Sequence, residues 1–126
     1  MDLSLIFWIY LINSVILINH EIDSAYWQEW KLFNPDYTSD VKGFLLIHFP
    51  ILFAILFGLI LIERELLAGY VISFFVALSG IFAFFFHFYH LRKGCKEFNN
   101  WLSKLILILT LPLSIIQIVL TIMNII

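Results

Sequence analysis

The chain has 126 residues, of which 63% are hydrophobic and 13% are charged, and its formal net charge is −2. Its mean hydropathy of +1.01 excludes a soluble globular domain, because a fold of this size cannot bury so much apolar surface. The single cysteine, Cys95, excludes an internal disulfide. The composition therefore predicts an all-α integral membrane protein.

Four apolar stretches are long enough to cross a membrane, since a spanning helix needs roughly 20 apolar residues. They cover about residues 3–19, 44–62, 66–89 and 101–126. Because they take up most of the chain, residues 1–126 are predicted to form a single domain, a four-helix bundle with both termini on the same side. The first stretch is not expected to be a cleaved signal peptide, because no basic residue precedes it and no small residues end it.

The first predicted helix can continue beyond its apolar stretch, because residues 19–30 contain neither glycine nor proline. On that continuation Glu21 and Asp23 flank His20. One helical stripe would carry Asn13, His20, Ser24 and Trp27. The turn signal Asn34-Pro35-Asp36 is expected to end the segment.

The second and third predicted helices carry the other histidines. His48 lies two residues before Pro50, and a proline inside a helix can kink it. In the third helix, small residues recur every three or four positions and lead on to His87, which is therefore expected on the packed face. This small-residue stripe consists of Gly69, Ser73, Ala77 and Gly80. His90 follows three residues after His87, so both imidazoles are expected to reach one point.

Polar residues also recur every three or four positions along the fourth predicted helix. They are Thr110, Ser114, Gln117, Thr121 and Asn124. Polar side chains at membrane depth usually face the interior of a bundle. This stripe is therefore expected to point inward, where it either lines a cavity or forms hydrogen bonds across helices.

The basic residues gather on one side of the predicted bundle. Residues 20–43 and 91–100 would connect helices on that side, and they hold Lys31, Lys42, Arg92, Lys93 and Lys96. Only Arg64 falls on the side of the termini. Since lysine and arginine favour the cytoplasmic side, we expect the histidine-rich end to face the cytoplasm and the termini to lie outside.

All four histidines fall at this basic end of the four spans. They are His20, His48, His87 and His90. Imidazoles and carboxylates are common ligands of zinc, and of iron in helical bundles. The pattern therefore predicts a divalent metal, zinc or iron, held by ligands from these histidines and from Glu21 and Asp23. The alternative interpretation is that the histidines form hydrogen bonds across helices or contact lipid phosphates.

Several nearby residues have more than one interpretation. Glu21 could be a metal ligand, a general base acting on metal-bound water, or an exposed acid just beyond the span. Cys95 could add a soft ligand or be an incidental thiol in a turn. The other acids at this end are expected to be solvated loop charges: Glu29, Asp36 and Asp40. Motifs for nucleotide binding, haem attachment or nucleic-acid binding are absent, although haem between two histidines is not distinguished from a non-haem metal.

The segment from Asn19 to Trp30, with His48-Phe49-Pro50, resembles a family of small bacterial four-span membrane proteins of unknown function. The resemblance covers nearly the whole chain and implies a bacterial inner-membrane protein without an established activity. The chain departs from small membrane families named for a histidine followed by paired glutamates, because Asp23 and Ser24 occupy those positions. It also lacks the histidine boxes of membrane desaturases.

These observations lead to one main functional hypothesis and two alternatives. The main one is a metal-dependent enzyme that acts, by hydrolysis or oxidation, on a lipid or other apolar substrate from the bilayer. The first alternative is a non-enzymatic protein that binds a partner or assembles into a homo-oligomer or pore. The second is a small transporter or proton relay that uses His48, His87 and Glu21. No nucleic-acid partner is expected.

Overall fold

The computed structural model describes residues 4–33 and 41–126, and within them it contains five helices and no strand. They are α1 (Leu5–Trp27), α2 (Trp30–Phe33), α3 (Val41–Glu63), α4 (Leu67–Arg92) and α5 (Trp101–Ile125). All except the single-turn α2 are long and apolar enough to span a membrane. The predicted all-α, four-span architecture is therefore confirmed. The turn expected at Asn34-Pro35-Asp36, and the charges Asp36 and Asp40, lie outside the described residues.

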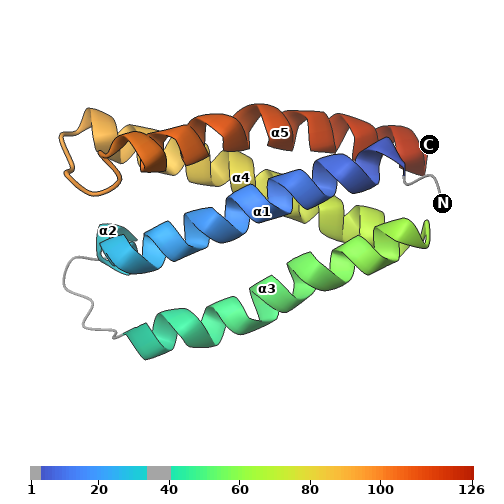
Figure 1. Cartoon of the computed structure of the whole chain (residues 1–126), viewed down its shortest axis with the longest axis horizontal. Coiled ribbons are helices and arrows are strands. Elements are labelled where there is room, and N and C mark those ends of the chain that lie inside the picture. The colour runs from blue at the N-terminus through green and yellow to red at the C-terminus, as the bar shows by residue number, and fades with distance from the viewer. Residues whose placement is uncertain (1–3, 34–40) are drawn as a thin grey trace.

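The four long helices run side by side, with α1 between α3 and α5 in the view of Figure 1. The beginning of α1 and the end of α5 lie at one end of the bundle. The other end carries α2, the start of α3 and the connection between α4 and α5, and we call it the loop end. The first helix continues well past its apolar stretch to Trp27, which confirms the predicted continuation.

Three helices end in the same kind of turn, in which one residue adopts the left-handed conformation. These residues are Gln28 after α1, Glu65 after α3 and Gly94 near the end of α4, with φ values of 56°, 54° and 85°. In each turn, the amide of the left-handed residue bonds a carbonyl three residues back, and the next amide bonds one five residues back. This is the hydrogen-bond pattern of a Schellman motif, which satisfies carbonyls left free at a helix end.

A hydrogen-bonded network of polar side chains joins α1, α4 and α5 in the interior. Nδ2 of Asn13 donates to Oε1 of Gln117 over 2.7 Å, and Nε2 of Gln117 donates to the backbone oxygen of Ser73 over 2.8 Å. The hydroxyl groups of Ser73 and Thr121 are 2.8 Å apart. Ser114, Gln117 and Thr121 of the polar stripe of α5 thus point inward and bond across helices. Thr110 is buried but bonds its own helix, and Asn124 is exposed and also bonds its own helix.

The small-residue stripe of α4 brings neighbouring helices into close contact. A Cβ atom at Gly69 would lie 2.7 Å from the backbone nitrogen of Ile62 on α3. A Cβ atom at Gly80 would lie 2.2 Å from the hydroxyl oxygen of Ser114 on α5. The prediction that this stripe is packed is therefore confirmed, and it includes His87, which is 1% exposed.

The helix α3 has buried residues only in its second half. Its buried residues are Ile55, Gly58 and Ile62. The hydroxyl of Tyr10 donates to the carbonyl of Ile55 over 2.7 Å, and Gly58 leaves the space that this hydroxyl occupies. Toward the loop end, α3 diverges from α4 in the view of Figure 1.

Candidate metal centre

Three side chains from two helices and the turn between α1 and α2 converge near the loop end. His20 projects from α1, Glu29 follows the left-handed turn at Gln28, and His87 lies near the end of α4. One ligand atom from each lies within 4.8 Å of the other two. Among the residues that the structure describes, this is the group of potential ligands that could hold a metal ion. We call it the His20–Glu29–His87 group.

The carboxylate of Glu29 is held between the helices rather than in water. Its Oε1 lies 3.2 Å from Nε2 of His87, and its side chain is 13% exposed. Burial acts to raise the pKa of Glu29, but the neighbouring His87 imidazole outweighs this effect, so that the pKa lies below its ordinary value. Glu29 is therefore the anionic member of the group at neutral pH.

Both imidazoles in the group are almost completely buried and have ring nitrogens without hydrogen-bond partners. His20 is 2% exposed, and its ring meets that of His87 edge to face with centroids 4.8 Å apart. The Nδ1 atoms of His20 and His87 lack a hydrogen-bond partner among the described residues, and Nε2 of His87 approaches only the carboxylate of Glu29. Leaving such atoms unpaired in the interior costs about 1–3 kcal/mol each. A metal ion that accepts a nitrogen lone pair, or a hydrogen-bond acceptor for an N–H group, would remove this cost.

An aromatic side chain from the connection between α4 and α5 covers the group. The ring centroid of Phe98 lies 4.1 Å from that of His87 and 6.1 Å from that of His20. Phe98 is 1% exposed, although its φ of 61° is unfavourable for a residue with a bulky side chain. Its burial against the imidazoles offsets this backbone cost and excludes water from that side.

The donor set suits a divalent transition metal. Atoms bound tetrahedrally to one zinc ion at about 2.1 Å lie about 3.4 Å from one another. The ligand atoms lie up to 4.8 Å apart, so side-chain rotations must bring them closer by about an ångström to reach that arrangement. Two imidazoles and one carboxylate fit zinc, and equally the three-ligand sites of non-haem iron.

A second pair of polar side chains lies beside the group and joins α1 to α3. Nε2 of His48 lies 2.6 Å from Oε2 of Glu21, and Nδ1 of His48 lies 2.7 Å from the carbonyl oxygen of Phe44. Because a carbonyl can only accept, Nδ1 of His48 carries a hydrogen. The contact between Nε2 and the carboxylate oxygen then requires one further proton between them. The Glu21–His48 pair therefore shares a proton.

A pocket of about 470 Å³ connects these two features. Its titratable lining residues are His20, Glu21, Glu29 and His48, and Ser79 adds a hydroxyl group. The remaining lining is mainly apolar and includes Ile47, Ile51 and Phe82, which are also exposed on the outer surface of the bundle. The pocket lies where the first half of α3 leaves the bundle, so it opens toward the surface that would face lipid.

The structure brings together only some of the predicted ligands. His20 and His87 meet in one group, whereas His48 and Glu21 pair with each other next to it. His90 turns away, and its Nδ1 lies 3.9 Å from the sulfur of Cys95. Asp23 is half-buried on α1 and lies outside the group. The expectation that His87 and His90 reach one point therefore differs from the observed arrangement.

The sequence interpretation of Glu29 as a solvated charge was wrong. A continued α1 would carry Glu29 away from the bundle, but the left-handed residue Gln28 reverses the chain and returns Glu29 to it. Such turns usually contain glycine or asparagine, and this one has neither. The spacing of Glu29 from His20 therefore gave no signal of their proximity.

The fold and the site together define a class of protein, a four-span helical membrane protein with a buried histidine and glutamate group at one end. The chain belongs to a family of unknown function, DUF6713, whose sequence profile matches residues 6–124. Neither a curated protein nor a solved structure matches the chain.

Proposed function

We propose that this chain is a metal-dependent membrane hydrolase that acts on a lipid entering its pocket from the bilayer. The observation that carries the proposal is the convergence of two imidazoles and a carboxylate beside a pocket open to the apolar surface. Two histidines and one glutamate form the ligand set of several catalytic zinc sites, which keep a fourth position for water or substrate. His20, Glu29 and His87 are the proposed ligands.

The shape of the pocket supports an amphiphilic substrate. Its volume of about 470 Å³ lies within the range of ligand pockets, roughly 300–1,000 Å³. Ile47, Ile51 and Phe82 are exposed and offer an apolar path from the bilayer, and His20, Glu21, Glu29 and His48 line the same pocket. A lipid would therefore enter with its acyl chain along α3 and present its ester or phosphodiester group to the metal centre.

The Glu21–His48 pair supports hydrolysis because it offers a place for the proton that the reaction moves. A bound divalent metal would supply Lewis acidity to a water molecule and to the scissile group. The water oxygen forms a bond to the acyl carbon or phosphorus, and the bond to the leaving oxygen breaks. The Glu21–His48 pair would deliver its shared proton to the leaving alkoxide and take up the proton lost by water, so that the pair is restored.

Elemental analysis of the purified protein tests the metal centre. We expect about one zinc per chain in the native protein and less than about a tenth of that in the His87→Gln variant. His90→Gln is the matched control, because His90 lies one turn further along the same helix and outside the group. The variant His87→Cys replaces one zinc ligand by another and should retain zinc, which separates loss of a ligand from loss of folding.

Incubation with phosphatidylglycerol or phosphatidylethanolamine vesicles tests the reaction, with mass spectrometry of the released fatty acids and headgroups. Zinc-dependent release that is lost in His87→Gln supports the proposal. Several results would contradict it: a protein free of metal, equal metal loss in His90→Gln, or bound iron with oxygen consumption. Proton flux into liposomes without lipid cleavage would instead favour the relay, and a defined crosslinked oligomer without cleavage would favour an assembly role.

The proposal includes an orientation in the membrane. We propose that the loop end faces the cytoplasm, because Arg92, Lys93 and Lys96 lie there and only Arg64 lies at the opposite end. The metal centre would then draw its metal from the cytoplasm and its substrate from the inner leaflet.

A further inference from the structure

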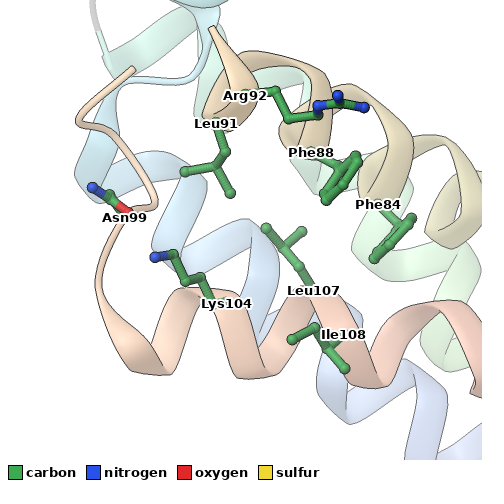
Figure 2. Close-up of a pocket in the computed structure, with 8 residues that line it drawn as sticks. All are labelled: Phe84, Phe88, Leu91, Arg92, Asn99, Lys104, Leu107 and Ile108. Atoms are coloured by element: carbon green, nitrogen blue, oxygen red, sulfur yellow. The ribbon is translucent and has the colours of Figure 1, made fainter. Parts of the chain in front are cut away.

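A second pocket lies on the other flank of the bundle, between α4 and α5 near the loop end. Its volume is about 330 Å³. Figure 2 shows the apolar side chains that line it, Phe84, Phe88 and Leu91 from α4 opposite Leu107 and Ile108 from α5. It shares no lining residue with the pocket of the metal centre. A ligand in this pocket would therefore be distinct from the substrate of the proposed hydrolase.

The pocket combines this apolar floor with two cationic side chains. Arg92 lies at the end of α4 with its guanidinium carbon 5.8 Å from the ring centroid of Phe88. Lys104 lies in the first turn of α5, and the amide of Asn99 completes the polar lining. Within the described part of the chain, no carboxylate lies within salt-bridge distance of Arg92 or Lys104. Both positive charges are therefore available to an anion.

The surrounding sequence strengthens this positive field. Residues 91–104 contain four cations, Arg92, Lys93, Lys96 and Lys104, and one carboxylate, Glu97. They lie at the end of two spanning helices, where lipid headgroups meet a membrane protein. Basic pockets between spanning helices suit the headgroups of anionic lipids, and each cation near the surface contributes about 1 kcal/mol of attraction.

The stacked rings extend the pocket along the membrane-facing surface. The ring planes of Phe84 and Phe88 lie within 9° of parallel, with centroids 5.7 Å apart. Ile108 on the opposite helix is 60% exposed, so this end of the pocket is open to hydrocarbon. A soluble anion would leave this apolar surface uncovered, whereas a phospholipid acyl chain would cover it.

We propose that the pocket between α4 and α5 binds an anionic phospholipid, with its headgroup at the loop end, where Arg92 and Lys104 line the pocket, and an acyl chain along Phe84, Phe88 and Ile108. The lipid would join the ends of α4 and α5 as a bound structural component. The proposal is independent of the metal centre, because it rests on a different pocket and different residues.

Native mass spectrometry of the full chain in detergent tests this site with dioleoylphosphatidylglycerol and dioleoylphosphatidylcholine as probes. We expect half-saturation by phosphatidylglycerol at a concentration about tenfold lower than by phosphatidylcholine. The reason is that the zwitterionic lipid gains less from the one or two charged contacts, each worth about 1 kcal/mol. The double variant Arg92→Gln/Lys104→Gln should lose this preference. Arg64→Gln, at the opposite end of the bundle, is the control and should retain it.

Two further measurements distinguish a bound lipid from a folding defect and from a site for free phosphate. The variant Arg92→Lys/Lys104→Arg keeps both charges and should keep the preference, which excludes a general folding defect in the glutamine variant. Millimolar inorganic phosphate should not displace phosphatidylglycerol. Equal binding of the two lipids, an unchanged preference in the glutamine variant, or displacement by phosphate alone would each overturn the proposal.

Discussion

Oε1 of Glu29 lies 3.2 Å from Nε2 of His87, and this contact depends on the backbone of Gln28. The left-handed turn at Gln28 sends the chain back across the end of α1, so that Glu29 meets the last turns of α4. One exposed residue thus determines whether a carboxylate joins two buried imidazoles. The candidate metal centre is a consequence of how α1 ends.

Replacing Glu21 tests the proposed proton-transferring role separately from metal binding. Glu21→Gln should leave the zinc content unchanged, because Glu21 bonds His48 and lies outside the His20–Glu29–His87 group. It should lower the rate of vesicle lipid hydrolysis by about 10²–10⁴-fold, as expected on loss of a general acid or base. Glu63→Gln, an exposed position at the opposite end, is the control and should change neither quantity. Full activity of Glu21→Gln would contradict the role.

The interior network should contribute measurably to stability. Gln117→Ala removes the bonds to Asn13 and to Ser73 and leaves both partners buried. Hydrogen bonds between spanning helices contribute about 0.6 kcal/mol on average, so we expect the free energy of unfolding to fall by about 1–3 kcal/mol once the unpaired groups are included. Unfolding in mixed detergent micelles measures this change. Asn124→Ala, which removes only a bond within α5, should have almost no effect.

The close approach of α3 and α4 should not tolerate an added methyl group. In Gly69→Ala, the new Cβ would lie 2.7 Å from backbone atoms of both Leu61 and Ile62, which cannot rotate away. The two helices must separate, and such overpacking costs about 1–3 kcal/mol. The midpoint of thermal unfolding in detergent should therefore fall. Ala68→Val, which enlarges an exposed neighbour, should leave it nearly unchanged. An unchanged midpoint in Gly69→Ala would show that this contact is looser than described.

The single cysteine provides a direct test of orientation. Cys95 is partly exposed in the connection at the loop end, so a membrane-impermeant maleimide should label it only from the cytoplasmic side. Inside-out vesicles should therefore react and intact cells should not. In a Cys95→Ser background, Ser4→Cys places the thiol at the opposite end and should give the reverse pattern. Labelling of Cys95 in intact cells would invert the proposed topology.

The periodic features of the sequence predicted the fold well, because they describe single helices. The inward polar stripe from Thr110 to Thr121 and the packed position of His87 follow from helical spacing alone. The pairing of partners depends instead on how helices cross. Glu21 contacts His48 because α1 and α3 lie side by side at these two residues. The spacing of residues within one helix does not predict which residues of another helix lie beside them.

The departures from the predicted site have equally local causes. His90 shares a helix with His87, but the turn at Gly94 places Cys95 beside its Nδ1. Glu29 enters the site through a turn that contains no glycine at its left-handed position. The sequence therefore located the polar end correctly, whereas the membership of the ligand group required the backbone geometry of two helix ends.

Tyr10 and Gly58 attach α3 to α1 at a point well away from the metal centre, while the first half of α3 has no buried residue. Apart from the contact between Glu21 and His48, the separation between α1 and α3 at the pocket therefore depends on the surrounding lipid as well as on the protein. A thinner or thicker bilayer tilts spanning helices to match their apolar length. We expect the width of the pocket mouth, and with it the rate at which substrate enters, to vary with the acyl-chain length of the host membrane.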